Sequence, residues 1–159
     1  MNATDRTFRH HFEDFTPGSV RESGGKTVSR EAVPAFAQEF DAQPVHIDDA
    51  AAEASLFGRL SASGWHTGAM TMRMICDGHL LEAASLGSPG IDSLRWLKPV
   101  HPGDTLSVRL EVLESRPLGS RPDVGLVRSC REVLNQDREV VLRMEGWGMF
   151  RRRPSGAHA

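Results

Sequence analysis

Apolar side chains recur every three or four residues in the first half of the chain and every second residue in much of the second half. Residues 30–40 show the helical spacing, and Ser29 is the expected N-cap of that helix. A second helix is predicted over residues 48–57, with an aspartate at its first position as the cap. Residues 12–26 show neither period and are predicted to form a short extended piece and a loop.

The third predicted helix, residues 63–81, differs from the other two because it has no polar face. Arg73 is its only charge before Asp77, and a helix that is apolar nearly all round is a buried one. Two-residue periods follow from residue 91 onward, separated by turn signals. The four strands predicted from this pattern cover residues 91–100, 105–113, 124–134 and 138–150.

A buried helix followed by enough strands to surround it predicts an α+β fold. We expect a single hot-dog domain over residues 1–159, in which a curved antiparallel sheet is wrapped around the long buried helix. The chain has no room for a second domain. Residues 1–11 and 151–159 are polar and unpatterned, so both ends are predicted to be frayed.

The composition is that of an ordinary soluble protein, with 39% hydrophobic and 25% charged residues. A net charge of -2 gives no electrostatic reason to expect nucleic acid or a membrane surface as a partner. No apolar run approaches the roughly 18 residues needed to span a bilayer. The two cysteines form no framework, which favours a reducing cytoplasm.

Asp41 and His46 place a carboxylate and an imidazole on one short loop. Asp41 directly follows a predicted helix, whose negative end disfavours another negative charge, so helix stability does not explain an acid there. Each residue alone has a structural explanation, an Asx turn for Asp41 and a hydrogen-bonded buried ring for His46. The pair at this spacing, ahead of a helix opened by Gly64, favours chemistry. Neighbouring side chains complete no zinc-like spacing, and no metal is predicted.

The segment Asp41-Ala-Gln-Pro-Val-His46 resembles the D-x-N-P-x-H signature of MaoC-like (R)-specific enoyl-CoA hydratases and acyl dehydratases. Gln43 stands where that family usually has Asn, and Ser63 stands where a His is common. The resemblance implies a hot-dog fold, a homodimer and an acyl-CoA thioester substrate, with no cofactor beyond that CoA. Its further matches are Asp48, Ala51 or Ala52, Phe57-Gly58, Ala62-Ser63-Gly64 and the turn Pro102-Gly103-Asp104-Thr105.

Hydration of an enoyl thioester needs a base for water, an acid for Cα and stabilisation of the enolate oxygen. We expect Asp41 to activate water and His46 to protonate Cα. The backbone N–H of Gly64, at a helix N-terminus, is expected to bind the enolate oxygen. The residues expected to contact the substrate are Gln43, Ser63 and Trp65.

Trp65 has two competing explanations, because it immediately follows the expected oxyanion residue. Its indole either faces the acyl group and limits chain length, or packs into the core, and about 100° of helix rotation separates the two. His79 and His101 fall in apparent loops and are expected to be solvated.

Three functions remain in competition. The first is a hydro-lyase acting on enoyl-CoA or (R)-3-hydroxyacyl-CoA. A hot-dog thioesterase is disfavoured because residues 64–76 contain no Asp or Glu to activate water against the thioester carbon. A non-catalytic acyl-CoA-binding module is kept open by Gln43, and binding of CoA esters without turnover would identify it. For the homodimer, either the sheet edges join or the helices meet across the interface.

Overall fold

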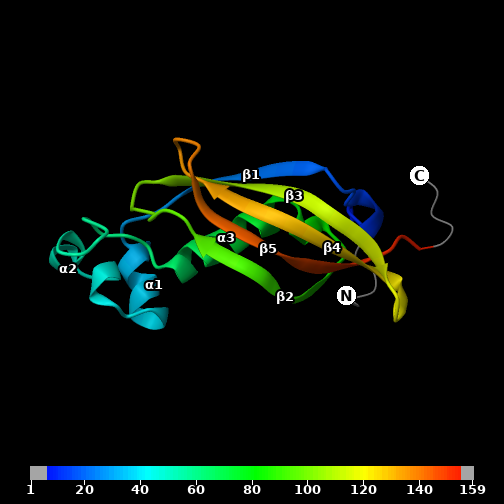
Figure 1. Ribbon diagram of the computed structural model, residues 1–159, viewed down its shortest axis with the longest axis horizontal. Helices are drawn as coiled ribbons and strands as arrows, with labels where there is room; N and C mark the ends of the chain where they lie inside the picture. The colour runs from blue at the N-terminus through cyan, green and yellow to red at the C-terminus, as the bar shows by residue number, and fades with distance from the viewer. Residues whose placement is uncertain (1–6, 155–159) are drawn as a thin grey trace.

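The computed structural model describes residues 7–154, which form three α-helices and one antiparallel sheet (Figure 1). The helices are α1 (Ala32–Phe40), α2 (Asp49–Glu53) and α3 (Gly64–Gly78), with short 3-10 helices at Phe12–Asp14, Pro44–His46 and Leu80–Glu82. The sheet has the strand order β1-β3-β4-β5-β2. Its strands are β1 (Val20–Thr27), β2 (Ser85–Trp96), β3 (Thr105–Leu118), β4 (Arg121–Leu134) and β5 (Val140–Arg151).

The core lies between one face of the curved sheet and α3, as the α+β prediction requires. Alternate residues of β3, from Leu106 to Val112, are buried. The first two, Leu106 and Val108, belong to the core cluster that contains Met70, Met74 and Ile75 of α3. Figure 1 shows α3 lying along the sheet, with α1 and α2 beyond one end of it. None of the helices in residues 7–154 is long and apolar enough to cross a membrane.

The helix α3 is not buried all round, contrary to the prediction. Met72 is 45% exposed and Trp65 is 59% exposed, because the sheet covers only one side of the helix. An apolar helix surface is therefore left uncovered in the single chain.

The pattern missed one glycine-containing strand, β1, and placed the start of another, β2, too late. The segment 21–26, predicted as a loop, is most of β1, and β2 begins at Ser85 instead of residue 91. Gly24 has a φ of +134° and Gly90 a φ of +154°, and the register shifts near both. Bulges of this kind interrupt the two-residue period, and Pro89 is tolerated because β2 is an edge strand.

Ser29 and Asp48 form the hydrogen bonds expected of them at the helix starts, but the helix boundaries differ from the prediction. The Ala32 N–H donates to Ser29 Oγ at 3.0 Å, although α1 begins only at Ala32. The Ala51 N–H donates to Asp48 Oδ1 at 2.9 Å, which makes Asp48 the cap of α2. The helix α2 is shorter than predicted and ends at Glu53.

The chain ends are held more firmly than predicted wherever the structure describes them. The Arg9 N–H donates to Glu82 O, the Arg152 N–H donates to Asp123 O, and Arg153 forms an ion pair with Asp14. Residues 1–6 and 155–159, also predicted to be frayed, lie outside the described residues.

The prediction that His79 and His101 are solvated is wrong. Both are less than 10% exposed. His101 Nδ1 bonds the Leu60 carbonyl oxygen at 2.8 Å, whereas His79 lies against Phe15 with their ring centroids 6.1 Å apart.

Candidate active site

The carboxylate of Asp41 is fixed by two side-chain donors. Asp41 ends α1, and the Gln43 N–H donates to the Asp41 carbonyl oxygen at 2.7 Å, which turns the chain sharply after the helix. Gln43 Nε2 then donates to Asp41 Oδ1, and Ser63 Oγ donates to Asp41 Oδ2, both at 2.6 Å. These bonds, with that from Gln43 the larger cause, lower the pKa of Asp41 below its ordinary range. Asp41 is therefore an ionised proton acceptor at neutral pH.

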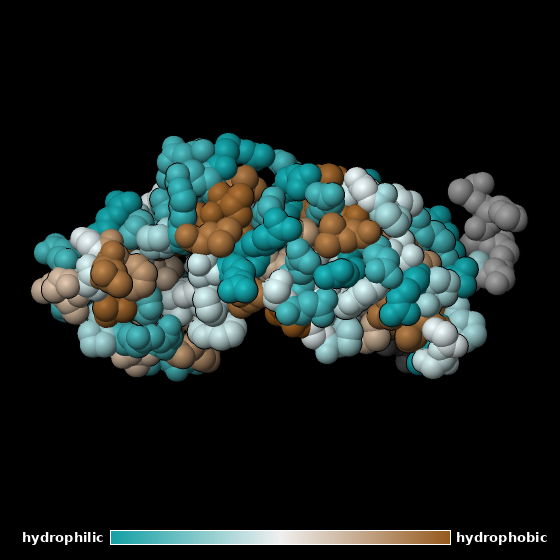
Figure 2. Space-filling view, viewed as in Figure 1, coloured by the Kyte–Doolittle hydropathy of each residue, from teal (hydrophilic) through white to brown (hydrophobic). Residues whose placement is uncertain are grey.

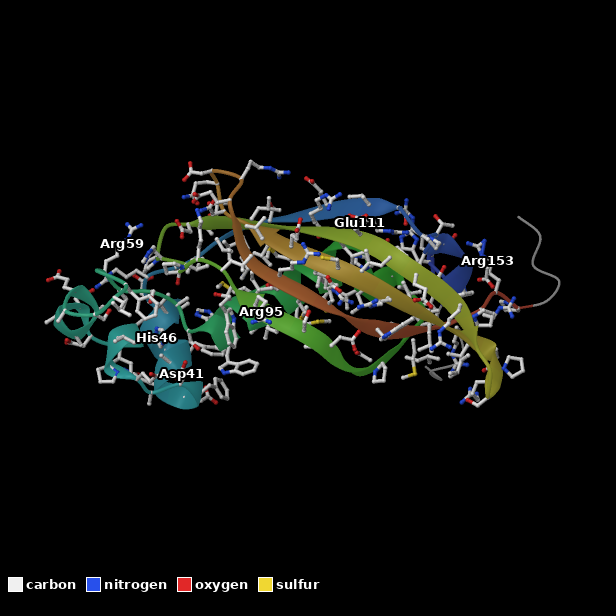
Figure 3. The ribbon with its side chains drawn as sticks, in the orientation of Figure 1. Asp41, His46, Arg59, Arg95, Glu111 and Arg153 are labelled. Atoms are coloured by element: carbon white, nitrogen blue, oxygen red, sulfur yellow. The ribbon has the colours of Figure 1, made fainter. Side chains whose placement is uncertain are left out.

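The imidazole of His46 is buried beside this carboxylate. His46 closes the 3-10 helix that Pro44 begins, and its Nδ1 lies 2.8 Å from the Ser61 carbonyl oxygen. A carbonyl only accepts hydrogen bonds, so Nδ1 carries a proton and Nε2 is the nitrogen that reacts. That Nε2 lies 3.7 Å from Asp41 Oδ2. Figure 3 shows the two side chains next to one another where α1 meets the following loop.

Ser63 positions the site and does not offer a surface to a substrate. It is fully buried, and its Oγ accepts the Trp65 N–H at 3.2 Å as the N-cap of α3 while donating to Asp41. The prediction that Ser63 binds substrate is therefore corrected, because its hydroxyl donates one hydrogen bond and accepts another within the chain. The hydrogen bond from Ser63 holds the Asp41 carboxylate next to the start of α3.

Gly64 is the first residue of α3, and no described residue accepts a hydrogen bond from its N–H. The residue must be small, because a Cβ there would lie 2.4 Å from the Trp96 ring. Trp96, at the end of β2, is the site residue that the sequence analysis missed. The only available signal was an aromatic residue in a predicted strand, and sequence alone gives no means of pairing it with Gly64.

Asp41, His46 and Gly64 open into one cavity of about 400 Å³. Gln43 also lines it, but its amide nitrogen is used by Asp41. The remaining lining is largely apolar and includes the edge-to-face pair of Trp65 and Trp96, whose ring centroids are 5.2 Å apart. Core packing is thus the wrong explanation for Trp65. Within residues 7–154 no three His, Cys, Asp or Glu side chains are grouped to hold a metal ion, and the absence of a metal remains a prediction.

Proteins of known family share the fold of this chain. Residues 13–128 match the family model described as a MaoC like domain. The structure resembles the MaoC-like dehydratase from Rhodospirillum rubrum, with 43% identity and a TM-score of 0.84, covering 91% of this chain and 98% of that one. The R-hydratase PhaJ1 from Pseudomonas aeruginosa is 27% identical with a TM-score of 0.71, covering 90% and 86% of the two chains. Mesaconyl-CoA hydratase from Cereibacter sphaeroides is 42% identical over 65 residues, 41% of this chain and 19% of that protein.

Proposed function

This chain belongs to the MaoC-like dehydratase family and has the hot-dog fold of its structural relatives, and on that basis we propose that it hydrates enoyl-CoA thioesters reversibly to (R)-3-hydroxyacyl-CoA. The observation that carries the proposal is that an ionised Asp41 lies beside Nε2 of His46 in a cavity that Gly64 also lines. The reaction needs no cofactor beyond the CoA of the substrate. A cytoplasmic location is part of the same proposal.

In the hydration direction, Asp41 removes a proton from water while the water oxygen forms a bond to Cβ. The electron pair of the double bond moves toward the thioester, and the carbonyl oxygen becomes an enolate that the Gly64 N–H binds. Protonated His46 then delivers the Nε2 proton to Cα, and the enolate returns to a thioester. The sum is the addition of one water molecule, with Asp41 left protonated and His46 left neutral.

The geometry supports this division of roles. After giving up its Nε2 proton, His46 is left with a proton on Nδ1, which is the tautomer that the Ser61 carbonyl oxygen binds. The 3.7 Å between Nε2 and Asp41 Oδ2 leaves only a short path for the proton to return from Asp41 to His46. Each carboxylate oxygen accepts more than one hydrogen bond, so Gln43 and Ser63 leave room for the attacking water.

An assay of thioester consumption separates this reaction from the two alternatives. Hydration removes the ultraviolet absorbance of the conjugated thioester without releasing thiol, whereas a thioesterase releases free CoA thiol. A binding module does neither. The structure favours hydration over thioester hydrolysis because the acidic residue within α3, Asp77, lies at its far end in an ion pair with Arg73.

Gln43→Leu is expected to shift the acid limb of the kcat/KM profile toward higher pH. Gln43 makes the larger contribution to the lowered pKa of Asp41, so its loss returns that pKa toward the ordinary range and the base is protonated earlier as the pH falls. The same bond stabilises the fold above the unfolded-state pKa of Asp41, and this stabilisation is lost as the pH falls through the folded-state value.

The measurement is a pH profile of enoyl-CoA hydration for the wild type and the variant. Gln38→Leu is the matched control, since Gln38 is exposed on α1 and has no bond to Asp41. An unchanged acid limb in Gln43→Leu would show that Gln43 does not set the protonation of the base.

We also propose a homodimer formed through β2 and the uncovered side of α3. The strand β2 is an edge of the sheet, and Ile91 and Leu97 are both more than 50% exposed on or just after it. Figure 2 shows apolar patches that interrupt a mainly hydrophilic face, over the sheet as well as at the end formed by α1 and α2. An open edge with apolar side chains is a liability that pairing of two chains removes.

Light scattering after gel filtration at micromolar concentration is expected to give the mass of a dimer, and Ile91→Lys is expected to give a monomer. Leu56→Lys is the control, because Leu56 is fully exposed after α2, which lies beyond one end of the sheet. A fully active wild-type monomer would contradict the proposal.

A further inference from the structure

Arg131 of β4 lies on the inner face of the sheet, where it lines a cavity together with residues of α3. In the register of the sheet it pairs with Leu110 of β3 and Met144 of β5, and both neighbours are apolar. The residues two positions away on the same face, Ser129 and Val133, are buried. A guanidinium therefore occupies a position where the sheet otherwise places core side chains.

No described residue forms an ion pair or a hydrogen bond with the Arg131 guanidinium. Burial lowers the pKa of Arg131, and no carboxylate is close enough to offset that effect. Arg131 is partly buried, and a cation that is partly removed from water without a partner is less stabilising there than an apolar residue of similar volume. Packing does not explain this arginine, so its partner is expected to come from outside the chain.

The guanidinium faces a second cavity of about 200 Å³, which is mostly apolar. Burial, and then Arg21 and Arg131, lower the pKa of His79 in its wall to about 4, so that ring is neutral at pH 7. Arg21 does not line the cavity, since it donates to the Asp14 carbonyl oxygen and stacks over Phe15. Arg131 is therefore the one charged group among the described lining residues. An apolar chain that ends in an anion matches this lining.

The second cavity follows the first along α3. Met72, Ile75 and His79 line it from one face of the helix, and Met72 is eight residues beyond Gly64, about 12 Å along the axis. Both cavities also border β2, the first at Trp96 and the second at Ser85 to Ile91. A chain with its thioester at Gly64 runs toward Arg131 when it is extended along the helix.

We propose that the acyl group of the substrate ends in a carboxylate, and that Arg131 binds this distal carboxylate. The inference rests on the proposed hydratase function, whose acyl-CoA class it narrows to thioesters of dicarboxylic acids. Gly87 and Gly148 in the cavity wall leave space beside the chain, and Ser129 supplies a hydroxyl next to the guanidinium on the same strand. A methyl-ended chain would leave the Arg131 donors without an acceptor.

Saturated thioesters test the binding without any dependence on catalysis. Calorimetric titration of the wild type is expected to show that suberoyl-CoA binds at least about 10-fold more tightly than octanoyl-CoA, the scale of one charge-assisted interaction. Arg131→Met is expected to abolish or reverse that preference. Arg143→Met is the control, because it removes the same charge from the neighbouring strand on the exposed outer face.

Equal binding of the two thioesters by the wild-type protein overturns the proposal, and so does a preference that survives Arg131→Met. Folding is checked by thermal unfolding, in which Arg131→Met is expected to melt at or above the wild-type temperature. The proposed reaction and this inference fail separately. Selective binding of suberoyl-CoA without hydration of any enoyl-CoA refutes only the reaction, and hydration of crotonyl-CoA without the binding preference refutes only the role of Arg131.

Discussion

Asp41→Asn and His46→Gln are each expected to lower kcat/KM for hydration of crotonyl-CoA by at least about 10²-fold, the usual scale for a general acid or base. Asn keeps the size of the Asp41 side chain but is not a base. In His46→Gln, the amide still reaches for the Ser61 carbonyl oxygen, but no group remains that exchanges a proton at neutral pH. Both variants should remain folded, which circular dichroism and thermal unfolding will show.

Two neighbouring residues provide matched controls. Asp48→Asn makes the same change on the same loop, and Asn caps a helix as well as Asp does, so α2 and the activity should be retained. His101→Gln removes another buried histidine whose Nδ1 bonds a carbonyl oxygen, but His101 does not line the cavity. If Asp41→Asn or His46→Gln lost no more activity than its control, that residue would have no part in proton transfer.

Removal of the Gly64 N–H is expected to cost about 10²- to 10³-fold in kcat, the typical loss of one oxyanion donor. A direct substitution is not informative, because any Cβ at Gly64 collides with Trp96. The comparison is therefore made in a Trp96→Ala background, which provides the space. In that background, Gly64→Pro removes the N–H. Gly64→Ala is the control, because it retains the N–H while its side chain also takes up space left by Trp96.

Proline is compatible with this position. It is favoured at the first residue of a helix, and Ser63 before it has φ -52° and ψ 143°, the extended conformation that precedes proline. The two double variants should unfold at similar temperatures, and kcat for crotonyl-CoA should differ between them. Equal kcat values would contradict the oxyanion role and would leave Gly64 as a residue selected for its contact with Trp96.

The parts of the site that depend on local sequence could be predicted. Asp41 and His46 are brought together by a loop of four intervening residues, and Asp48 caps the next helix through a bond to a residue three positions away. The start of α3 at Gly64 also follows from its neighbours. In each case the decisive contact joins groups that are close along the chain.

The parts that depend on distant pairing could not be predicted. Trp96 meets Gly64 only because β2 returns alongside α3, and the glycine-rich bulges of β1 and β2 hide the strand period. The orientation of Ser63 toward Asp41 depends on the packing of α1 against α3, which no local pattern records. The inward direction of Arg131 follows from the register between β3 and β4, and the sequence around it shows only an arginine in a predicted strand.

The most direct test of the central claim is chiral analysis of the product that the purified protein forms from crotonyl-CoA. The account predicts (R)-3-hydroxybutyryl-CoA with the thioester intact, and no product above background from Asp41→Asn. Recovery of unchanged crotonyl-CoA from the wild-type protein across a panel of enoyl-CoA chain lengths, or release of free CoA in place of hydration, would contradict it.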